Sequence, residues 1–375
     1  MALSAMMELS AIYSLALVAG FIYLYFIRWF TQGIHRARQA AGNFSEQTDI
    51  PLSIIISAHN EEEYIPLTLD SLAEQQYPHE KFEIVVIADR CTDNTVKIVE
   101  HYQNRLPMLH YLEITKVPND FSPKKYAIHQ GIETARHNHL ILLDADCQLA
   151  PGALKCFSGL FGQGFEAVVS IPKFSRFSSP LYKYYLPERI LAWGIAAAAI
   201  GGKKPFLAFG TVWAYTRAAY QKAGGMKKIA HAVSGDDDLL VYQIGNESLP
   251  VAFCFNSQGW GQTRAPHTVS EFIRQRRRHH SAGKYYAGPV QWGYVLFHLS
   301  NLGLWLLPFF QPLLVLPLLA KVILDFAVLS RTAKIFHENL NLLQIIFFEI
   351  GLVVHHVLVA PLGFIGKISW GKSLD

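Results

Sequence analysis

An almost uncharged stretch near the start of the chain, from Ala11 to Phe30, constrains most strongly what the rest can fold into. It has the length of about 20 residues that a helix needs to cross the hydrocarbon core of a bilayer. Arg28, Arg36 and Arg38 lie at or beyond its end, and no cleavage site of the small-x-small kind follows. The sequence therefore predicts a retained membrane anchor, and the positive-inside rule places the residues after it in the cytosol.

The C-terminal part contains further apolar runs. One spans 290–329 and is interrupted near Pro308 and Pro312, which indicates two helices in a hairpin, and another spans 342–365. If both runs crossed the bilayer completely, Lys367 and Lys372 would lie outside, against the positive-inside rule. The sequence leaves open whether one C-terminal segment lies in the membrane interface instead of spanning.

Composition supports a chain that is partly membrane and partly globular. Of the 375 residues, 51% are hydrophobic and only 17% are charged, a low charged fraction for a soluble protein. The formal net charge of +4 gives no ground for expecting a nucleic-acid partner.

Between the apolar ends, short apolar runs alternate with amphipathic stretches. We expect strands at 52–58, 82–89, 109–114, 139–146 and 166–171, because these runs are almost continuously apolar, as in strands covered on both faces. The stretches at 61–75 and 93–105 have helical periodicity. Alternating strands and helices predict a doubly wound α/β sheet, which binds ligands at the carboxyl ends of its strands.

Acidic residues follow several of these strands. Asp89 closes the second predicted strand, and Asp144 and Asp146 close the fourth. No Gly-x-Gly-x-x-Gly or P-loop lysine motif is present, so neither a dinucleotide enzyme nor an ordinary ATPase is predicted. Carboxylates can hold a diphosphate only through a divalent cation. The Asp-x-Asp spacing places both side chains on one side of an extended segment, which suits Mg²⁺ or Mn²⁺ with open positions for phosphate oxygens.

These motifs, in this order, resemble glycosyltransferase family 2, a family of inverting enzymes with the GT-A fold. The resemblance covers about residues 50–280 and is carried by these segments: SIIISAHNEEEYI, ADRCTDNT, SPKKYAIHQGI, LLDADC, GTVWAYTRAAYQKAGGM, SGDDDLL and QRRRH. Three positions depart from the family pattern: Pro123 replaces a Gly, His129 an Asn, and His279 the Trp of Gln-x-x-Arg-Trp. With helices at both ends, the layout resembles lipid-glycosylating members such as ceramide glucosyltransferase.

The resemblance implies a role for each matching residue. The donor, a nucleotide-diphosphate sugar and most simply a UDP-sugar, would contact Ala58, Asn60, Glu61, Asp89, Lys124 and Asp144. Asp144 and Asp146 would hold Mg²⁺ or Mn²⁺. Catalysis would involve Asp237 as the base, together with Asp236, Gln275 and Arg278. Three consecutive aspartates, 236–238, leave the register of the base open by one position.

The sequence thus predicts an N-terminal anchor and linker (1–48), a cytosolic GT-A catalytic domain (49–280) and C-terminal transmembrane or interfacial helices (281–375). We expect a multi-pass protein of a bacterial inner membrane that transfers a hexose to a membrane lipid. A processive polysaccharide synthase or a polyprenyl-phosphate sugar transferase on the same scaffold remains an alternative. A membrane scaffold that binds nucleotide sugars without catalysis is a further alternative, although such a protein has no use for a general base at Asp237.

Overall fold

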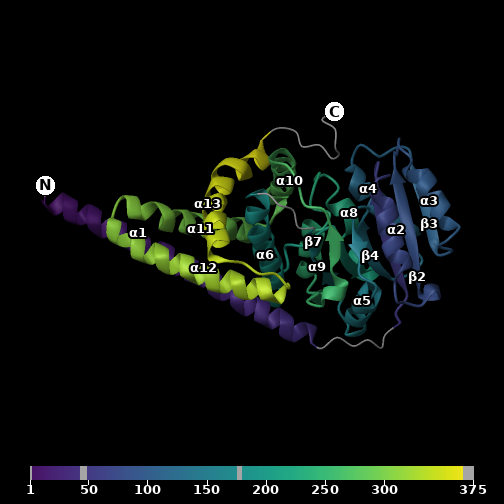
Figure 1. Ribbon diagram of the computed structural model, residues 1–375, viewed down its shortest axis with the longest axis horizontal. Helices are drawn as coiled ribbons and strands as arrows, with labels where there is room; N and C mark the ends of the chain where they lie inside the picture. The colour runs from purple at the N-terminus through teal and green to yellow at the C-terminus, as the bar shows by residue number, and fades with distance from the viewer. Residues whose placement is uncertain (1, 43–48, 175–179, 366–375) are drawn as a thin grey trace.

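The computed structural model describes residues 2–42, 49–174 and 180–365. Figure 1 shows an α/β part on one side and a group of long helices that extends away from it on the other, with the N-terminus at the far end of this group. The polar middle of the sequence therefore folds as a compact body, and the apolar ends come together beside it.

A seven-stranded sheet in the order β3-β2-β1-β4-β8-β6-β9 forms the centre of the α/β part. Four strands lie where the sequence predicts them, and they run parallel to one another: β1 (Leu52–Ala58), β2 (Phe82–Asp89), β3 (Leu109–Ile114) and β4 (His139–Asp144). The fifth prediction corresponds to β6 (Ala167–Val169), which is shorter than its apolar run.

The other half of the sheet contains strands that the sequence pattern did not predict. β8 (Val212–Thr216) pairs antiparallel with both β4 and β6, and β9 (Val251–Phe253) pairs parallel with β6. The sheet is therefore mixed rather than wholly parallel. A second, three-stranded sheet has the order β5-β10-β7, formed by Gln148–Leu149, Gly261–Thr263 and Pro172–Phe174.

Helices connect and cover the strands. Those of the α/β part are α2 (Ile65–Ala73), α3 (Thr95–Gln103), α4 (Pro123–Thr134), α5 (Ala153–Gly162), α7 (Arg217–Lys222), α8 (Gly225–Lys228), α9 (Asp238–Asn246) and α10 (Val269–Ala282). α4 packs on β1 and β2, where a Cβ on Gly131 would stand 2.5 Å from Ile55 Cγ2. This close approach fixes α4, and with it Lys124 in its first turn, over the end of the sheet.

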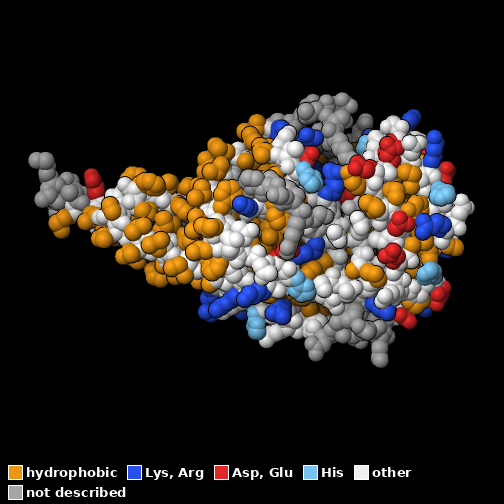
Figure 2. All heavy atoms as spheres, in the orientation of Figure 1, with side chains coloured by type: hydrophobic (Ala, Val, Ile, Leu, Met, Phe, Trp, Pro, Cys, Tyr) orange, Lys and Arg blue, Asp and Glu red, His pale blue; other side chains and the backbone are white. Residues whose placement is uncertain are grey.

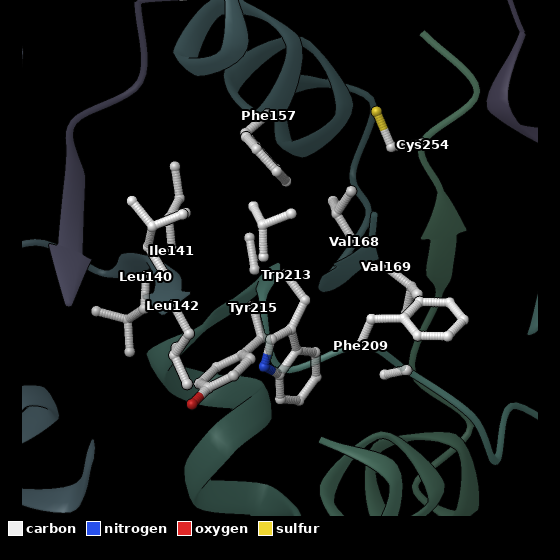
Figure 3. Close-up of a cluster of buried hydrophobic side chains, with 14 of the residues drawn as sticks. Leu140, Ile141, Leu142, Phe157, Val168, Val169, Phe209, Trp213, Tyr215 and Cys254 are labelled. Atoms are coloured by element: carbon white, nitrogen blue, oxygen red, sulfur yellow. The ribbon is translucent and has the colours of Figure 1, made fainter. Parts of the chain in front are cut away.

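The main core lies around β4, β8 and β6. Figure 3 shows Phe157 of α5 and the rings of Trp213 and Tyr215 on opposite sides of these strands. Trp213 and Tyr215 are two residues apart on β8, so their side chains share a face, and their ring centroids are 4.6 Å apart. All three side chains are fully buried. This packing makes β4 a rigid support for the aspartates at its end.

Four helices form the apolar part: α1 (Ala2–Ala41), α11 (Gly288–Leu306), α12 (Val315–Ile335) and α13 (Leu342–Val354). α11 and α12 are joined by short turns at Pro308 and Pro312, which confirms the predicted hairpin. Within the described residues, three helical segments are long and apolar enough to cross a membrane: Met6–Ala41, Pro312–Ile335 and Leu342–Phe364. Figure 2 shows a continuous apolar surface over this part of the molecule.

α13 differs in direction from the other long helices. Figure 1 shows it running across α11 and α12, whereas α1 and α12 run alongside each other. α13 packs on α6 (Pro180–Gly201), and a π-helical turn, His355–Val359, and the short helix Ala360–Phe364 follow it, the latter against α10. The last apolar run is thus attached to the α/β part.

α1 is joined to the α/β part by close packing on α6. A Cβ on Gly33 of α1 would stand 2.5 Å from the Ala198 carbonyl oxygen, and one on Gly201 would stand 1.9 Å from the Gly33 carbonyl oxygen. Only glycine allows the two helix backbones to approach so closely. The N-terminal helix is therefore an integral part of the fold and not a loosely tethered anchor.

A buried group of charged residues connects the long helices to one another. Lys321 and Asp325 of α12 form an ion pair of 3.0 Å, and Lys321 also pairs with Glu349 of α13. Tyr23 of α1 donates a hydrogen bond to Asp325, and Trp305 of α11 donates one of 3.5 Å to Glu349. Lys321, Asp325 and Glu349 are each at most 4% exposed. This group links α1, α11, α12 and α13 where water cannot reach.

We predict that Lys321→Met strongly destabilises the protein. The substitution leaves two buried carboxylates without their cation, and breaking a buried pair in this way costs about 3–5 kcal/mol. Thermal unfolding in a mild detergent measures the loss. The double variant Lys321→Met/Glu349→Gln removes one of the unpaired charges and should recover part of the stability. A single variant as stable as the wild type would contradict a role for this group in holding the helices together.

Candidate active site

Three parallel strands bring their polar ends to one edge of the sheet. In the register of the sheet, Ala58 of β1 is opposite Ala88 of β2, and Ser57 is opposite Asp144 of β4. Asp89 is the last residue of β2. Because adjacent parallel strands end together, the predicted residues of the three motifs meet at this edge, as the sequence pattern indicated.

Lys124 links the end of β4 to the acidic segment 236–238. Its Nζ lies 2.8 Å from Asp144 Oδ1 and 3.2 Å from Asp236 Oδ2, and only 12% of its side chain is exposed. Burial disfavours its charge, but the Asp144 and Asp236 carboxylates outweigh this and raise the Lys124 pKa above its ordinary value. Lys124 therefore stays protonated and holds two motifs that lie far apart in the sequence in contact.

The three consecutive aspartates have different surroundings. Both Asp238 oxygens are engaged, since Oδ1 accepts a hydrogen bond from Ala208 N at 3.0 Å and Oδ2 accepts one from Tyr286 Oη at 2.6 Å. Asp236 is buried beside Lys124, and despite its burial the charges of Lys124 and Lys125 hold its pKa below the usual range. Asp238 therefore anchors its segment, and Asp236 serves as the partner of the lysines.

Asp237 is the remaining carboxylate of the segment. Its Oδ2 accepts a hydrogen bond from Gly210 N at 2.6 Å, and its Oδ1 accepts one from Asp238 N at 2.8 Å. A Cβ on Gly210 would stand 3.2 Å from Asp237 Oδ2 and 3.4 Å from both Asp236 Oδ2 and Lys124 Nζ. Burial, followed by the adjacent Asp236 charge, raises the Asp237 pKa to about 6. A half-buried carboxylate with this pKa suits a general base near neutral pH.

The Asp89 carboxylate is buried and already has hydrogen-bond partners. It is 4% exposed, and its two oxygens accept hydrogen bonds from Arg90 Nε at 2.8 Å and Arg90 Nη2 at 2.9 Å. Its backbone carbonyl lies 2.6 Å from His59 Nδ1. The predicted contact with a nucleoside therefore requires the Arg90 side chain, which is more exposed, to share or release the carboxylate.

The turn after β1 is tied to the turn after β2. Asn60 has a φ of +56°, and its Oδ1 accepts a hydrogen bond from Thr92 N at 2.8 Å. Glu61 N donates to Thr95 Oγ1 at 2.9 Å. Asn60 and Glu61 thus shape the rim of the strand ends. Ala58 is fully buried, so its predicted contact with the donor is one that only its backbone can make.

The predicted arginine–glutamine motif lies on α10. Arg278 stands near enough to Lys124 to lower the pKa of that amine, which places its guanidinium on the same side as the acids. Gln275 Oε1 is buried and has no hydrogen-bond partner among the described residues. Gln275 therefore has a buried acceptor that no described residue uses, and Arg278 lies within electrostatic reach of Lys124.

The neighbouring arginines of α10 have structural partners instead. Arg276 is 2% exposed, and its Nη2 lies 2.6 Å from Glu188 Oε2. Arg277 donates hydrogen bonds to the carbonyls of Leu362 and Ile365 at 3.0 and 2.7 Å. Two members of the basic run 274–278 therefore hold the fold together.

Comparisons with known proteins agree with this geometry. Residues 53–224 match the model of the family described as glycosyl transferase family 2. The chain carries a family 2 glycosyltransferase domain. The matched range includes the strand-end acids and Lys124, whereas Asp237 and α10 lie beyond it.

Curated relatives of the family 2 domain are similar over part of their length. Poly(ribitol-phosphate) beta-N-acetylglucosaminyltransferase TarS of Staphylococcus aureus is 34% identical over 103 residues, which are 28% of this chain and 17% of TarS. The 4,4'-diaponeurosporenoate glycosyltransferase of the same species is 24% identical over 245 residues, 60% of this chain and 61% of the relative. The chain thus spans less than two thirds of either relative.

A solved structure covers nearly the whole chain. The mannosyltransferase PcManGT from Pyrobaculum calidifontis, in complex with GDP-Man and Mn²⁺, aligns with 92% of this chain and 94% of its own, with a TM-score of 0.56 and 17% sequence identity. The likeness shows that the fold is of the GT-A type, as the sequence predicted.

The acids of the family 2 domain fit a divalent cation. Burial, followed by the nearby Asp144 charge, raises the Asp146 pKa, although the charges of Arg264 and Lys124 act against this rise. A divalent cation between the two carboxylates would further offset their repulsion. Within the described ranges, no group of three or more His, Cys, Asp or Glu forms a closed cage for a metal. Mg²⁺ is commonly held by one or two carboxylates together with substrate phosphates and water. The pair is thus suited to a cation that arrives with a diphosphate.

The structure also brings residues to the family 2 site that the sequence motifs did not reveal. Lys125, fully buried, donates hydrogen bonds of 2.7–3.0 Å to three carbonyls in the segment 229–234, just before the aspartates. Arg264, which follows β10, lies near enough to Asp146 to lower the pKa of that carboxyl. The position of Lys125 directly after the motif residue Lys124 could have indicated its role. Nothing in the sequence around Arg264 indicated that this residue lies near the site.

Proposed function

We propose that the protein transfers a hexose, with inversion, from a nucleotide-diphosphate sugar to a hydroxyl of a membrane lipid. The observation that carries this proposal is that Lys124 joins the strand-end Asp144 to the segment of Asp237, a carboxylate whose pKa is raised to about 6. A site with a cation-binding acid pair and a base of this pKa suits displacement of a diphosphate by a hydroxyl.

In the proposed reaction, the acceptor oxygen attacks the anomeric carbon as the bond from that carbon to the diphosphate breaks. Asp237 takes the hydroxyl proton, and the electron pair of the broken bond leaves with the nucleotide diphosphate. Lys124 and Arg278 stand beside the position of the departing phosphates and counter their negative charge. Asp144 and Asp146 would hold Mg²⁺ or Mn²⁺, which when bound stabilises the charge that develops on the diphosphate.

A lipid acceptor is supported by the position of the site relative to the apolar helices. α10, which carries Gln275 and Arg278, packs against the last apolar segment through Ala360–Phe364. A relative is named as a glycosyltransferase for 4,4'-diaponeurosporenoate, which is not a polysaccharide. We infer that the acceptor hydroxyl reaches Asp237 from the membrane surface. The donor is either a UDP-sugar, as the motifs suggest, or a GDP-sugar, as in the complex of PcManGT.

The proposed topology places the α/β part in the cytosol, with three full crossings made by α1, α11 and α12. Arg38 near the end of α1 and Lys334 near the end of α12 line the same hollow, so both helices have their basic ends on one side. Because α13 runs across these helices, we propose that it lies in the interface or re-enters the membrane. A helix α13 that does not cross the bilayer removes the conflict with the positive-inside rule; Lys367 and Lys372 themselves lie outside the described residues.

Release of nucleotide diphosphate tests the proposed donor. The full-length protein in nanodiscs made with a bacterial lipid extract should release UDP or GDP from the matching hexose donor only when acceptor lipid and a divalent cation are both present. If no nucleotide diphosphate is released from any UDP- or GDP-hexose, the protein is a binding scaffold and the proposed function is wrong.

The raised pKa of Asp237 leads to a prediction for pH. A base accepts a proton only in its ionised form, so kcat should be constant above a pH of about 6 and fall about tenfold per unit below it. The measurement is kcat at saturating donor as a function of pH, with tryptophan fluorescence to show that the protein remains folded. A rate that does not change well below this pKa would contradict the role of Asp237 as base.

A further inference from the structure

A hollow with a basic lining lies at the ends of α1 and α12. Its volume is about 420 Å³, and its walls are formed by Arg38, Phe255, Arg331, Lys334, Ile335 and His337. Three segments contribute: the last turns of α1, the residues after β9, and the last turns of α12 with His337, two residues beyond its end. None of these residues belongs to the proposed active site.

The lining concentrates positive charge. Arg38, Arg331 and Lys334 are exposed to solvent, and no carboxylate is among the described residues that line the hollow. Glu338, which directly follows His337 in the sequence, forms an ion pair with Lys173. Like charges that face one hollow repel one another, and an anion between them removes this repulsion. The arrangement therefore favours an anionic ligand.

The position of the hollow indicates where that anion comes from. Arg38 belongs to the apolar segment Met6–Ala41, and Arg331 and Lys334 belong to Pro312–Ile335, both of which are long enough to cross a membrane. Figure 2 shows Lys and Arg side chains gathered at the edge of the molecule where the apolar surface over α1 and α12 ends. Side chains at this level of a membrane protein meet the headgroups of lipids.

The hollow also has apolar walls. Phe255 and Ile335 line it beside the charged groups, and Phe255 packs against Phe336 with the ring centroids 6.5 Å apart. A free phosphate ion gains nothing from such walls, whereas the glycerol and acyl portions of a phospholipid can lie against them. Arginine, with its planar fork of donors, is well suited to the phosphate itself.

We propose that this hollow binds the phosphate of an anionic membrane phospholipid, whose acyl chains lie along α1 and α12. Arg38, Arg331 and Lys334 bind the phosphate group, and Phe255 and Ile335 contact the glycerol region. Since Phe255 belongs to the α/β part, a bound lipid connects that part to both membrane helices. The site is thus separate from the acceptor site and serves to hold the α/β part at the anionic surface of the membrane.

Lipid binding by the full-length protein tests the proposal. In detergent, native mass spectrometry with added phosphatidylglycerol should detect a bound lipid, with weaker binding of phosphatidylcholine. The variant Arg38→Gln/Arg331→Gln/Lys334→Gln should bind phosphatidylglycerol on the order of 100-fold more weakly, because three favourable charge contacts are lost. The single variant Lys334→Gln should lose about fivefold, which gives a readout even if the triple variant folds poorly.

A matched control separates this site from the general charge of the protein. The variant Lys97→Gln/Lys222→Gln/Lys227→Gln removes three exposed positive charges from the α/β part and should bind phosphatidylglycerol as the wild type does. Equal binding by the control, the wild type and the hollow variants would overturn the proposal. Displacement of the lipid by millimolar inorganic phosphate would show instead that the hollow is a site for a soluble anion, which would also overturn it.

Discussion

Asp237→Asn should reduce turnover by a factor of at least about 10², the lower end of what a positioned general base contributes. Asparagine keeps an oxygen that can accept the hydrogen bond from Gly210 N and loses only the one from the adjacent Asp238 N, so the segment should remain folded. It cannot take a proton from the acceptor. We therefore expect binding of the nucleotide sugar, measured by isothermal titration calorimetry, to stay close to that of the wild type while kcat falls.

The neighbouring aspartates provide the control for this experiment. Asp238→Asn alters a residue whose oxygens are bound to Ala208 N and Tyr286 Oη, so it should affect stability more than kcat. Asp236→Asn removes a partner of Lys124 and should weaken donor binding. If Asp237→Asn remains active while one of these two variants loses turnover, the base has been assigned to the wrong position of the segment.

Asp146→Ala should abolish transfer, with a loss of at least about 10³-fold, since a bound cation contributes several kcal/mol to stabilising the departing diphosphate. The same substitution should prevent Mn²⁺ from strengthening the binding of nucleotide diphosphate, which is a readout that does not depend on activity. For the wild type, a chelator should stop the reaction, and Mg²⁺ or Mn²⁺ should restore it.

The exposed Asp120 offers a matched control, because Asp120→Ala removes one carboxylate from the α/β part without touching the strand ends. This variant should keep both metal-dependent binding and turnover. Full activity of the wild-type protein in excess chelator would show that Asp144 and Asp146 do not act through a cation, and the remaining role of Asp144 would be to hold Lys124.

The parallel half of the sheet could be predicted from the sequence because its strands are continuous apolar runs that end in polar turns. β4 is an example, since HLILLD has no polar interruption before Asp144. β8, with the sequence VWAYT, was not predicted, because it is short and is followed directly by α7. Its antiparallel pairing with β4 depends on contacts between distant segments, which no local pattern records.

The residues of the candidate active site could likewise be predicted only in part. The motif residues at strand ends could be anticipated, because parallel strands necessarily end at one edge. The surroundings that distinguish the three adjacent aspartates could not be predicted, because they come from distant segments: Lys124 pairs with Asp236, and Tyr286, 48 positions after Asp238, donates a hydrogen bond to it. Arg264, just after the small sheet, lies near enough to Asp146 to lower the pKa of that carboxyl, and this proximity exists only after folding. The buried charged group around Lys321 is likewise a product of helix packing.

The central claim is that one hexose is transferred to a membrane lipid, and mass spectrometry of the lipid product tests it most directly. The full-length protein in lipid nanodiscs, given donor and Mg²⁺ or Mn²⁺, should yield a lipid with a single added hexose and an equal amount of free nucleotide diphosphate. Three candidate membrane spans in the described residues, one of which runs across the others, offer little to enclose a growing chain. A ladder of products with increasing numbers of hexoses would contradict the account and indicate a processive synthase.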